Sequence, residues 1–181
     1  ASRTTTPNTT GGNAGEEITA ADANTNATSL IESVFEAIQK LDEKNVPTQG
    51  RVCIVAPDQY YQLANVDKLV NRDFSRDNGD FGKGTVLSIG GVPIVKSNTA
   101  TEVFATDLSA SISGTNNTYN GDFSNTHCVV MHSSAIGTVK LKDLVMESTY
   151  DPRRLGTLMT ARMALGHGIL RPESAISIKT A

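Results

Sequence analysis

Two long strands joined by a turn are predicted by KDLVMESTYDPRRLGTLMTARMALGHG, residues 142–168, and this stretch decides the fold. In its second half the residues at 155, 157, 159, 161, 163 and 165 share one face at the period of a strand. A helix over 155–165 is the alternative interpretation. Gly156, Gly166 and Gly168 weaken it, because glycine is unfavourable inside helices.

A helix is predicted well upstream of this hairpin. SLIESVFEAIQKLDEKN, residues 29–45, places large apolar residues at helical spacing. Ser29 and Glu32 match a capping box at its start. Asn45 can end the helix, and Pro47 cannot continue it.

Shorter elements lie between the helix and the hairpin. RVCIVA, residues 51–56, is typical of a buried strand and leads into a second helix that starts at Pro57. Gly90 and Gly91 suit a two-residue turn between two further strands, and Pro93 places the second of these at a sheet edge. HCVVMH, 127–132, predicts another buried strand.

Two segments are predicted to lie outside the core. Residues 1–27 are rich in Thr, Asn, Gly and Ala and have almost no large apolar side chain, so burial cannot offset the entropy of ordering them. We expect an arm or loop there. Residues 107–126 are rich in Ser, Asn and Gly and are predicted to be a surface insertion.

Composition excludes several classes of protein. The chain has 181 residues, 16 basic and 19 acidic side chains and a net charge of −3, so the basic surface of a dedicated nucleic-acid binder is missing. Cys53 and Cys128 each lie in an apolar run, where a thiol packs as a small hydrophobic group, and no disulfide framework is expected. No run approaches the roughly 18 apolar residues of a membrane span, and no signal peptide is evident. We expect a soluble protein of intracellular origin, and the start at Ala1 leaves room for a fragment.

The candidate chemical sites are weak. GDFGKGT, residues 79–85, fails both the phosphate-loop and the dinucleotide spacings. His127, Cys128 and His132 lack a further cluster to complete a metal site, and strand alternation separates the two histidines. No Gly-x-Ser-x-Gly elbow or recognisable Cys/His signature indicates a nucleophile. We therefore predict no catalytic residue, no metal and no cofactor.

The charged residues around the DPRR turn allow two interpretations. Glu147, Asp151, Arg153 and Arg154 can bind a phosphate or form ion pairs across a subunit boundary. The plain interpretation is a solvated hairpin tip, in which each exposed pair contributes roughly 0 to 1 kcal/mol. His167, between two glycines, reads first as a strand end.

The run from Met131 to Ile178 resembles the C-terminal part of major capsid proteins of short-tailed bacteriophages of the T-seven type, including cyanophage relatives. SAIGTVKLKDL at 134–144 and MALGHGILRPE at 163–173 carry the likeness. Upstream, LDEKNVPTQGRVCIVAPDQYYQL at 41–63 is similar to the same family. The resemblance spans most of residues 28–180.

This resemblance implies an α+β chain with the HK97-like capsid fold, in which a mixed sheet is flanked by helices. It implies a flexible arm or extended-loop remnant at 1–27 and a spine helix of the peripheral domain at 28–50. It further implies an axial domain at 51–137, with the insertion at 107–126, and a peripheral hairpin with a strand returning to the axial sheet at 138–181.

The implied function is that of a head-shell subunit, which assembles into hexamers and pentamers of an icosahedral shell around double-stranded DNA. The implied partners are other copies, a scaffolding protein, a portal and loosely held DNA, but no membrane. The implied location is the virion, after synthesis in the host cytoplasm. In this role Glu147, Asp151, Arg153 and Arg154 become candidate subunit contacts.

Two alternatives stay open. A small α/β enzyme could use residues distant in sequence, such as His132 or His167 with a carboxylate, and would show them within hydrogen-bond reach. An accessory binding module displayed on a particle would lack a spine helix packed beside a long hairpin.

Overall fold

The computed structural model describes residues 15–66, 79–80, 85–86, 88–104 and 123–180. The chain divides into two units: one comprises the chain up to Ala135 and from Arg171 onward, and the other is Ile136–Leu170. The helices and strands, with two 3-10 turns, are β1 (Glu16–Thr19), α1 (Ala27–Glu43), β2 (Arg51–Val55), α2 (Pro57–Ala64), β3 (Gly79–Asp80), β4 (Thr85–Val86), β5 (Ser88–Ile89), β6 (Val92–Lys96), α5 (Asn98–Phe104), β7 (Thr126–His132), Ser133–Ala135, β8 (Ile136–Asp151), β9 (Gly156–Ile169), Pro172–Ser174 and β10 (Ala175–Lys179).

The first unit is built on a mixed sheet of six strands in the order β1-β10-β7-β2-β6-β5. β1 pairs with β10 and β2 pairs with β6 in parallel, while the other neighbours are antiparallel. β10 occupies the residues predicted for a returning strand and lies beside β7. The sheet thus joins segments from both ends of the described chain.

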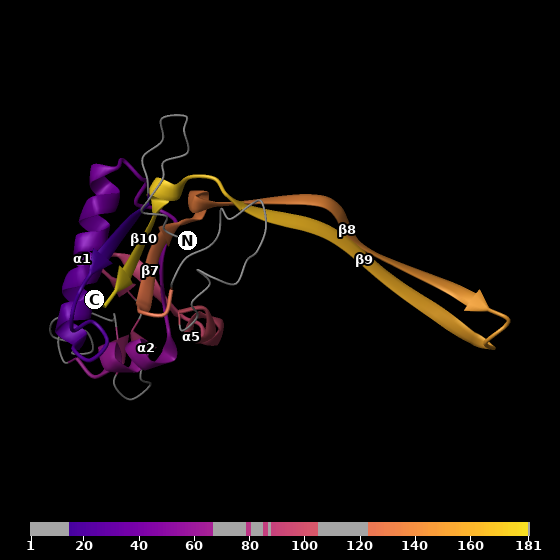
Figure 1. Cartoon of the computed structure of the whole chain (residues 1–181), viewed down its shortest axis with the longest axis horizontal. Coiled ribbons are helices and arrows are strands. Elements are labelled where there is room, and N and C mark those ends of the chain that lie inside the picture. The colour runs from indigo at the N-terminus through magenta and orange to yellow at the C-terminus, as the bar shows by residue number, and fades with distance from the viewer. Residues whose placement is uncertain (1–14, 67–78, 81–84, 87, 105–122, 181) are drawn as a thin grey trace. The chain divides into compact units, whose positions relative to one another are not determined.

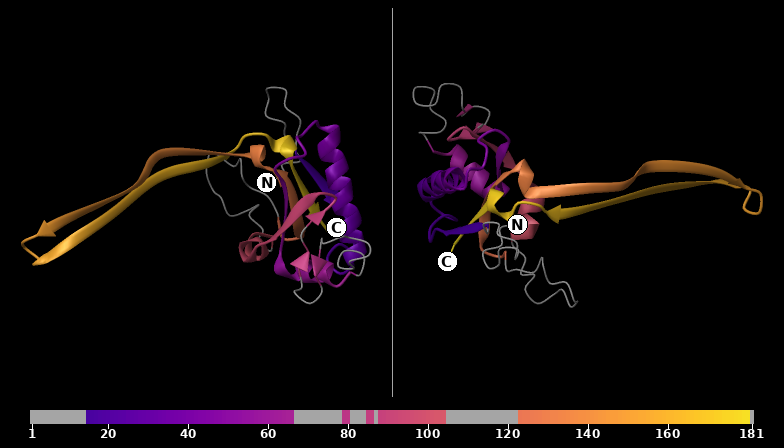
Figure 2. Two further views of the ribbon diagram at one scale, coloured as in Figure 1. Left: turned by 180° about the vertical axis from the view of Figure 1, so that it is seen from behind. Right: turned by 90° about the horizontal axis from the view of Figure 1, so that it is seen from above.

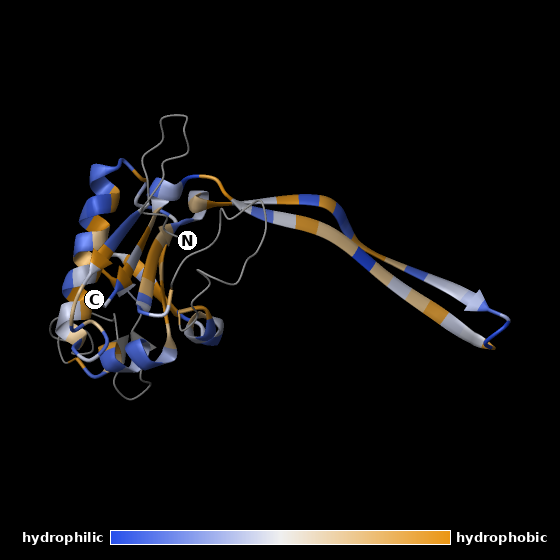
Figure 3. Cartoon of the chain, in the orientation of Figure 1, coloured by the Kyte–Doolittle hydropathy of each residue, from blue (hydrophilic) through white to orange (hydrophobic). Residues whose placement is uncertain are grey.

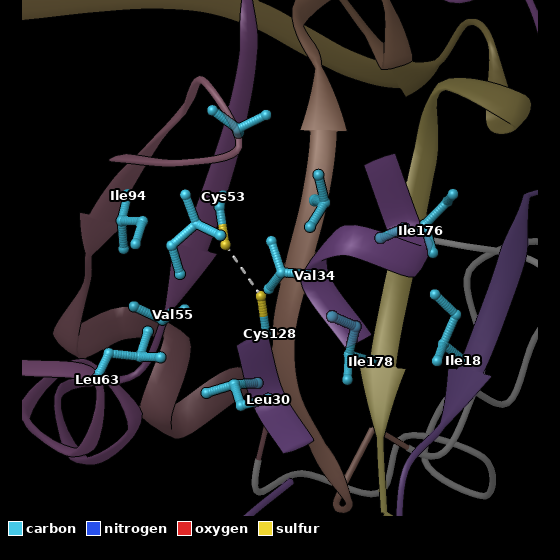
Figure 4. Packing of buried hydrophobic residues seen from close by; sticks show 14 of the residues in the cluster. Ile18, Leu30, Val34, Cys53, Val55, Leu63, Ile94, Cys128, Ile176 and Ile178 are labelled. Carbon is cyan, nitrogen blue, oxygen red and sulfur yellow. Dashed lines mark hydrogen bonds between the residues drawn. The ribbon is translucent and has the colours of Figure 1, made fainter. Parts of the chain in front are cut away.

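The core lies between this sheet and α1 (Figures 1 and 2). The helix presents a fully buried stripe of Leu30, Val34, Ala37 and Leu41, whose spacing follows the helical period. The strands contribute alternate residues to this core. In β7 the buried Cys128 and Val130 alternate with the half-buried His127, Val129 and Met131. Figure 4 shows Val34 and Leu30 among the inward side chains of β2, β7 and β10.

The start of α1 differs from the prediction. The predicted capping box of Ser29 and Glu32 is wrong, because the helix begins at Ala27 and the Asn26 side chain caps it by accepting from the Thr28 N–H at 3.0 Å. Ser29 is already inside the helix, and its carbonyl accepts from the Ser33 hydroxyl at 2.8 Å. The sequence analysis considered only Ser29, although asparagine is an equally favoured capping residue.

The predicted end of α1 at Asn45 is confirmed. Asn45 has φ +54°, the left-handed conformation that asparagine tolerates better than most residues. The Val46 N–H bonds the Leu41 carbonyl at 3.0 Å, and the Asn45 N–H bonds the Asp42 carbonyl at 2.9 Å. These two bonds make a Schellman motif, which satisfies carbonyls at the helix end.

Residues 16–19, predicted as part of an arm, form the edge strand β1 instead. Ile18 buries its side chain in the core, and ion pairs hold the strand on both sides. Glu16 reaches Lys40 at 2.7 Å and Lys44 at 2.9 Å on α1, while Glu17 pairs with Lys179 of β10. One apolar residue in a polar segment was too weak a signal to predict a strand, because burial of Ile18 depends on the distant β10.

The assignment of α1 as a spine helix stays a prediction. The resemblance assigned it to a peripheral domain with the hairpin, divided from the sheet near residue 50. In the structure α1 belongs to the same compact unit as the six-stranded sheet. Its buried stripe accounts for this, because the apolar face of the sheet covers it.

The turn at Gly90 and Gly91 is confirmed, with φ +56° and +79° and with Ile89 paired to Val92 across it. The prediction that Pro93 lies in an edge strand is wrong, because β5 flanks β6 on one side and β2 on the other. Pro93 is tolerated because it faces Ser88 one position beyond the closing pair, and the β2 ladder begins only at Ile94.

The second unit is a two-stranded antiparallel hairpin, so the predicted strands are confirmed and the helical alternative is wrong. β8 has 16 residues and β9 has 14, and the register shifts twice between Lys140 and Val145. The shifts place the extra residues of β8 in bulges. Figure 3 shows apolar residues distributed along both strands.

No helix in the described part of the chain is long and apolar enough to span a membrane. Most of the predicted insertion, residues 107–122, and most of the loop 79–85 lie outside the described residues.

Candidate functional site

Three of the four predicted contact residues lie together at the tip of the hairpin. The carboxylate of Asp151 accepts from the Arg153 N–H at 3.0 Å, and its other oxygen lies 4.0 Å from Arg154 Nε. The Arg154 N–H also donates to the Asp151 carbonyl at 3.2 Å. Asp151 therefore organises the turn, and the Arg154 side chain, 86% exposed, points its charge into solvent.

Glu147 does not join this group. It lies four residues before Asp151 along β8, and its carboxylate accepts from Arg162 of β9 at 2.9 Å. Arg162 was missed at the sequence level. Counting residues outward from the DPRR turn places positions 147 and 162 near each other on opposite strands. The same count fails before Val145, because the bulges in β8 shift the register there.

The residue that follows the arginines has an unusual backbone. Leu155 has φ +47° and is 83% exposed. A left-handed conformation costs a branched L-residue roughly 1–2 kcal/mol. The tip thus consists of two exposed arginines and an exposed leucine in a strained conformation.

The three histidines bond to neutral partners. His132 Nε2 is hydrogen-bonded to the Gln49 carbonyl, and His132 Nδ1 is hydrogen-bonded to the Ser134 hydroxyl, both at 2.8 Å. His167 Nδ1 lies 2.9 Å from the Thr138 hydroxyl. Within the described ranges none of these histidines is hydrogen-bonded to a carboxylate, which is the observation that the enzyme alternative required.

His127 is placed in the same structural role. Its ring nitrogens lie 3.5 Å from Gln59 and 3.3 Å from Thr180, and burial lowers its pKa. His127, Cys128 and His132 do not form a metal cluster, and no other group of three His, Cys, Asp or Glu side chains does so among the described residues.

The two cysteines are buried in the core with their sulfurs 3.2 Å apart (Figure 4). The hydrogen bond with Cys53 and then burial raise the pKa of the Cys128 thiol well above its usual value. Both effects favour a neutral thiol over a nucleophilic thiolate. The cysteines therefore pack as the sequence predicted.

The Arg-Pro-Glu segment forms the turn that leads from residue 171 into β10. Arg171 places Nε at 3.0 Å and Nη2 at 2.6 Å from one carboxylate oxygen of Glu173. Pro172 begins the 3-10 turn that places Ala175 at the start of β10. This segment therefore has a structural role in the turn.

The family model described as Gp10A-like, major capsid protein, matches residues 1–179. The chain belongs to the Gp10A-like family of major capsid proteins. Its similarity to individual members agrees with this assignment.

The major capsid protein of Enterobacteria phage T3 is 26% identical over 166 residues, covering 82% of this chain and 45% of that protein. The major capsid protein of Escherichia phage T7 is also 26% identical, covering 81% of this chain and 45% of that protein. The chain thus spans about half the length of these relatives.

Solved capsids have the same fold. A capsid structure of the cyanophage P-SCSP1u matches with a TM-score of 0.76 and 33% identity, over 94% of this chain and 54% of that one. The mature capsid of bacteriophage PhiM1 matches with a TM-score of 0.74 and 24% identity, over 97% of this chain and 55% of that one. The predicted α+β fold class of the HK97-like capsid type is therefore confirmed, as is the predicted family.

Proposed function

We propose that this chain forms part of the head-shell subunit of a tailed bacteriophage. The observation that carries the proposal is the long hairpin of β8 and β9 in a chain of this capsid family. The hairpin forms a two-stranded ribbon that has no core of its own. An isolated two-stranded hairpin is marginal in water, and exposed apolar groups on this scale indicate a surface that another molecule covers.

The exposed side chains support this interpretation. Thirteen large hydrophobic residues of the hairpin unit are more than 40% exposed: Ile136, Val139, Leu141, Leu144, Val145, Met146, Tyr150, Leu155, Leu158, Met159, Met163, Leu165 and Leu170. The sheet unit instead buries most of its described large apolar residues in one cluster, and only Phe35, Tyr61, Val95 and Val103 among them are about half exposed. The difference favours a division into a self-sufficient body and a contact arm.

In the proposed shell the sheet unit serves as the axial domain, and residues 136–170 serve as the peripheral arm. Copies assemble through heterologous contacts that close into hexameric and pentameric rings, and the rings join into an icosahedral shell. The shell encloses double-stranded DNA in the virion, after synthesis in the host cytoplasm. A scaffolding protein and a portal are the other proposed partners.

The charge of the chain suits a container. A shell with a strongly basic wall would hold the phosphates of packaged DNA tightly, because binding releases counterions. A net charge of −3 avoids this retention. Contact with DNA is therefore loose and independent of sequence in this proposal. The function lies in shape and repeated contact rather than in catalysis, and the neutral partners of the histidines support that inference.

We further propose that Glu147, Asp151, Arg153 and Arg154 contribute to a contact between subunits. Charge reversal at Arg153 and Arg154 should lower particle yield and the thermal stability of particles. The same change should leave the unassembled chain folded, since neither side chain is buried. Unchanged yield and unchanged particle stability would remove these arginines from the contact.

Negative-stain electron microscopy tests the main proposal. The natural gene product that contains this chain would be expressed together with its scaffolding protein. Uniform shells are the expected result. Persistent monomers, with neither rings nor shells, would overturn the proposed function.

A further inference from the structure

The outer half of the hairpin has an unbroken register. From Val145 to Asp151 each residue of β8 faces one residue of β9 between Arg162 and Gly156, with no shift. Directly opposite residues of an antiparallel pair carry their side chains on the same face, and successive residues alternate between faces. The register therefore sorts this segment into two faces of different composition.

One face is charged. Glu147 and Arg162 form their ion pair across it at 2.9 Å, and Asp151 lies on it next to the turn. Val145, Thr149, Leu158 and Thr160 complete this charged face.

The opposite face carries no charged side chain. It is formed by three residues from each strand, all exposed: Met146, Ser148, Tyr150, Thr157, Met159 and Ala161. We call this the uncharged face. Its two methionines and its tyrosine are 64%, 67% and 61% exposed, respectively.

We propose that the uncharged face makes the close, dehydrated contact with a second copy of this chain, while the charged face stays hydrated at the rim of that contact, where Glu147 and Asp151 act through their charge. The inference rests on the proposed function and deepens it, because it states which side of the arm makes the contact. Covering the uncharged face removes apolar surface from water. Covering the charged face would desolvate the pair of Glu147 and Arg162 as well.

The size of the uncharged face indicates a repeated contact. Two strands about 4.8 Å apart, each rising about 3.3 Å per residue over five residues, present a ribbon roughly 10 Å wide and 17 Å long. A stable interface covers about 800 Å² on each partner, several times this footprint. The face is too small to hold a dimer alone, and it suits a contact that many identical copies repeat.

Charge favours a second copy as the occupant. The hairpin unit, Ile136–Leu170, has five basic and three acidic side chains, which leaves eleven basic and sixteen acidic ones in the rest of the chain. The arm and the remainder therefore carry net charges of opposite sign. Such complementarity attracts the arm of one copy toward another copy and guides its orientation.

Neighbouring residues of β9 provide a matched test. Met159 on the uncharged face and Leu158 on the charged face are 67% and 59% exposed, respectively. Met159→Lys keeps the length of the side chain and adds a charge to the uncharged face. Leu158→Lys adds the same charge one residue away, on the other face and near Glu147.

Each variant would be made in the natural gene product, expressed with its scaffolding protein, and shells would be counted by electron microscopy. We expect Met159→Lys to lower the shell yield at least tenfold and Leu158→Lys to change it less than twofold. Met146→Lys, on the same face in β8, should reproduce the loss. Thermal unfolding of the unassembled proteins checks that each variant folds.

The outcomes separate the two proposals. Absence of shells from the unaltered protein would overturn the proposed function. Shells from the unaltered protein and equal yields from all three variants, whether high or low, would overturn the choice of face alone. If Met159→Lys does not fold, the Met146→Lys variant decides, and a normal yield from it overturns the inference.

Discussion

The two units of the chain place similar apolar residues in opposite environments. In the sheet unit Val130 and Ile178 are fully buried, whereas in the hairpin Leu141 is 81% exposed and Met159 is 67% exposed. Both units contain strands with apolar residues at alternate positions. The contrast shows that alternation predicts which residues share a face and does not predict what covers that face.

The largest expected effect comes from one substitution made in both units. Leu41→Ala should lower the free energy of unfolding by about 2–5 kcal/mol, because it removes fully buried methyl groups and leaves a cavity. Leu141→Ala should change it by no more than about 0.5 kcal/mol, since its side chain is 81% exposed. Urea unfolding of the unassembled protein measures both. Equal effects would contradict the division into a buried core and an uncovered arm.

A second comparison concerns two arginines that each pair with an acid. Arg51 is 3% exposed and donates to Asp42 at 2.6 Å and to the carbonyls of Val46 and Pro47 at 2.5 and 2.9 Å. Arg51→Met should lower the free energy of unfolding by about 2–3 kcal/mol, because it leaves buried acceptors unpaired.

Arg162→Met is the matched control in the hairpin. Its ion pair with Glu147 is more than half exposed on both sides, so the loss should stay below about 1 kcal/mol. Thermal unfolding compares the two variants. A larger loss at Arg162 than at Arg51 would contradict the assignment of Arg51 as the link between the end of α1 and β2.

At the tip of the hairpin one substitution should raise the free energy of unfolding instead of lowering it. Leu155→Gly relieves the strain of φ +47° and adds back some backbone entropy to the unfolded state. We expect a net rise in the free energy of unfolding of up to about 1 kcal/mol. Leu158→Gly, in a regular strand of the same hairpin, should lower stability instead. Protection of hairpin amides from hydrogen exchange reports both changes.

The smallest expected effect concerns the edge strand β1. Hydrogen bonds from Lys40 and then Lys44 hold the pKa of Glu16 below its usual value. Folding then favours the ionised form, so the contribution to stability is present above the pKa of the unfolded state. That contribution is lost as the pH falls through the lower pKa of the folded state.

Glu16→Gln should therefore remove a few tenths of a kcal/mol at neutral pH and flatten the acid limb of the stability curve below a pH of about 4.5. Glu32→Gln is the control, because Glu32 is exposed on α1 and has no ion pair among the described residues. Unfolding curves measured from pH 7 downward should differ between the two variants. Parallel curves would contradict a role for Glu16 in holding β1.

Much of the fold could be predicted because local signals are strong where the chain has long, regular elements. The stripe that begins at Leu30 predicted α1, the pair Gly90 and Gly91 predicted a turn, and the flanks of the DPRR turn predicted two strands. The predictions were wrong where a segment had few apolar residues or where two nearby residues could both cap a helix. The helix start was assigned to Ser29 instead of Asn26, and β1 offered only Ile18 as a buried residue.

The candidate contact site was predicted in part for the same reason. Asp151, Arg153 and Arg154 are close in sequence, so a turn was enough to bring them together. The partner of Glu147 could not be assigned, because Arg162 lies 15 residues away and its position depends on the strand register. The two faces of the arm depend on the same register.

The helical and extended segments and the turns could be predicted from residue order, because they depend on residues that are near one another along the chain, and the family followed from runs such as 134–144 and 163–173. Only the tertiary structure decided that β1 lies beside β10, that α1 packs on the sheet, and that charge lies on one face of the hairpin. The physical reason is that pairing between distant strands selects one register among several with similar local preferences, and the core that forms across them makes that choice.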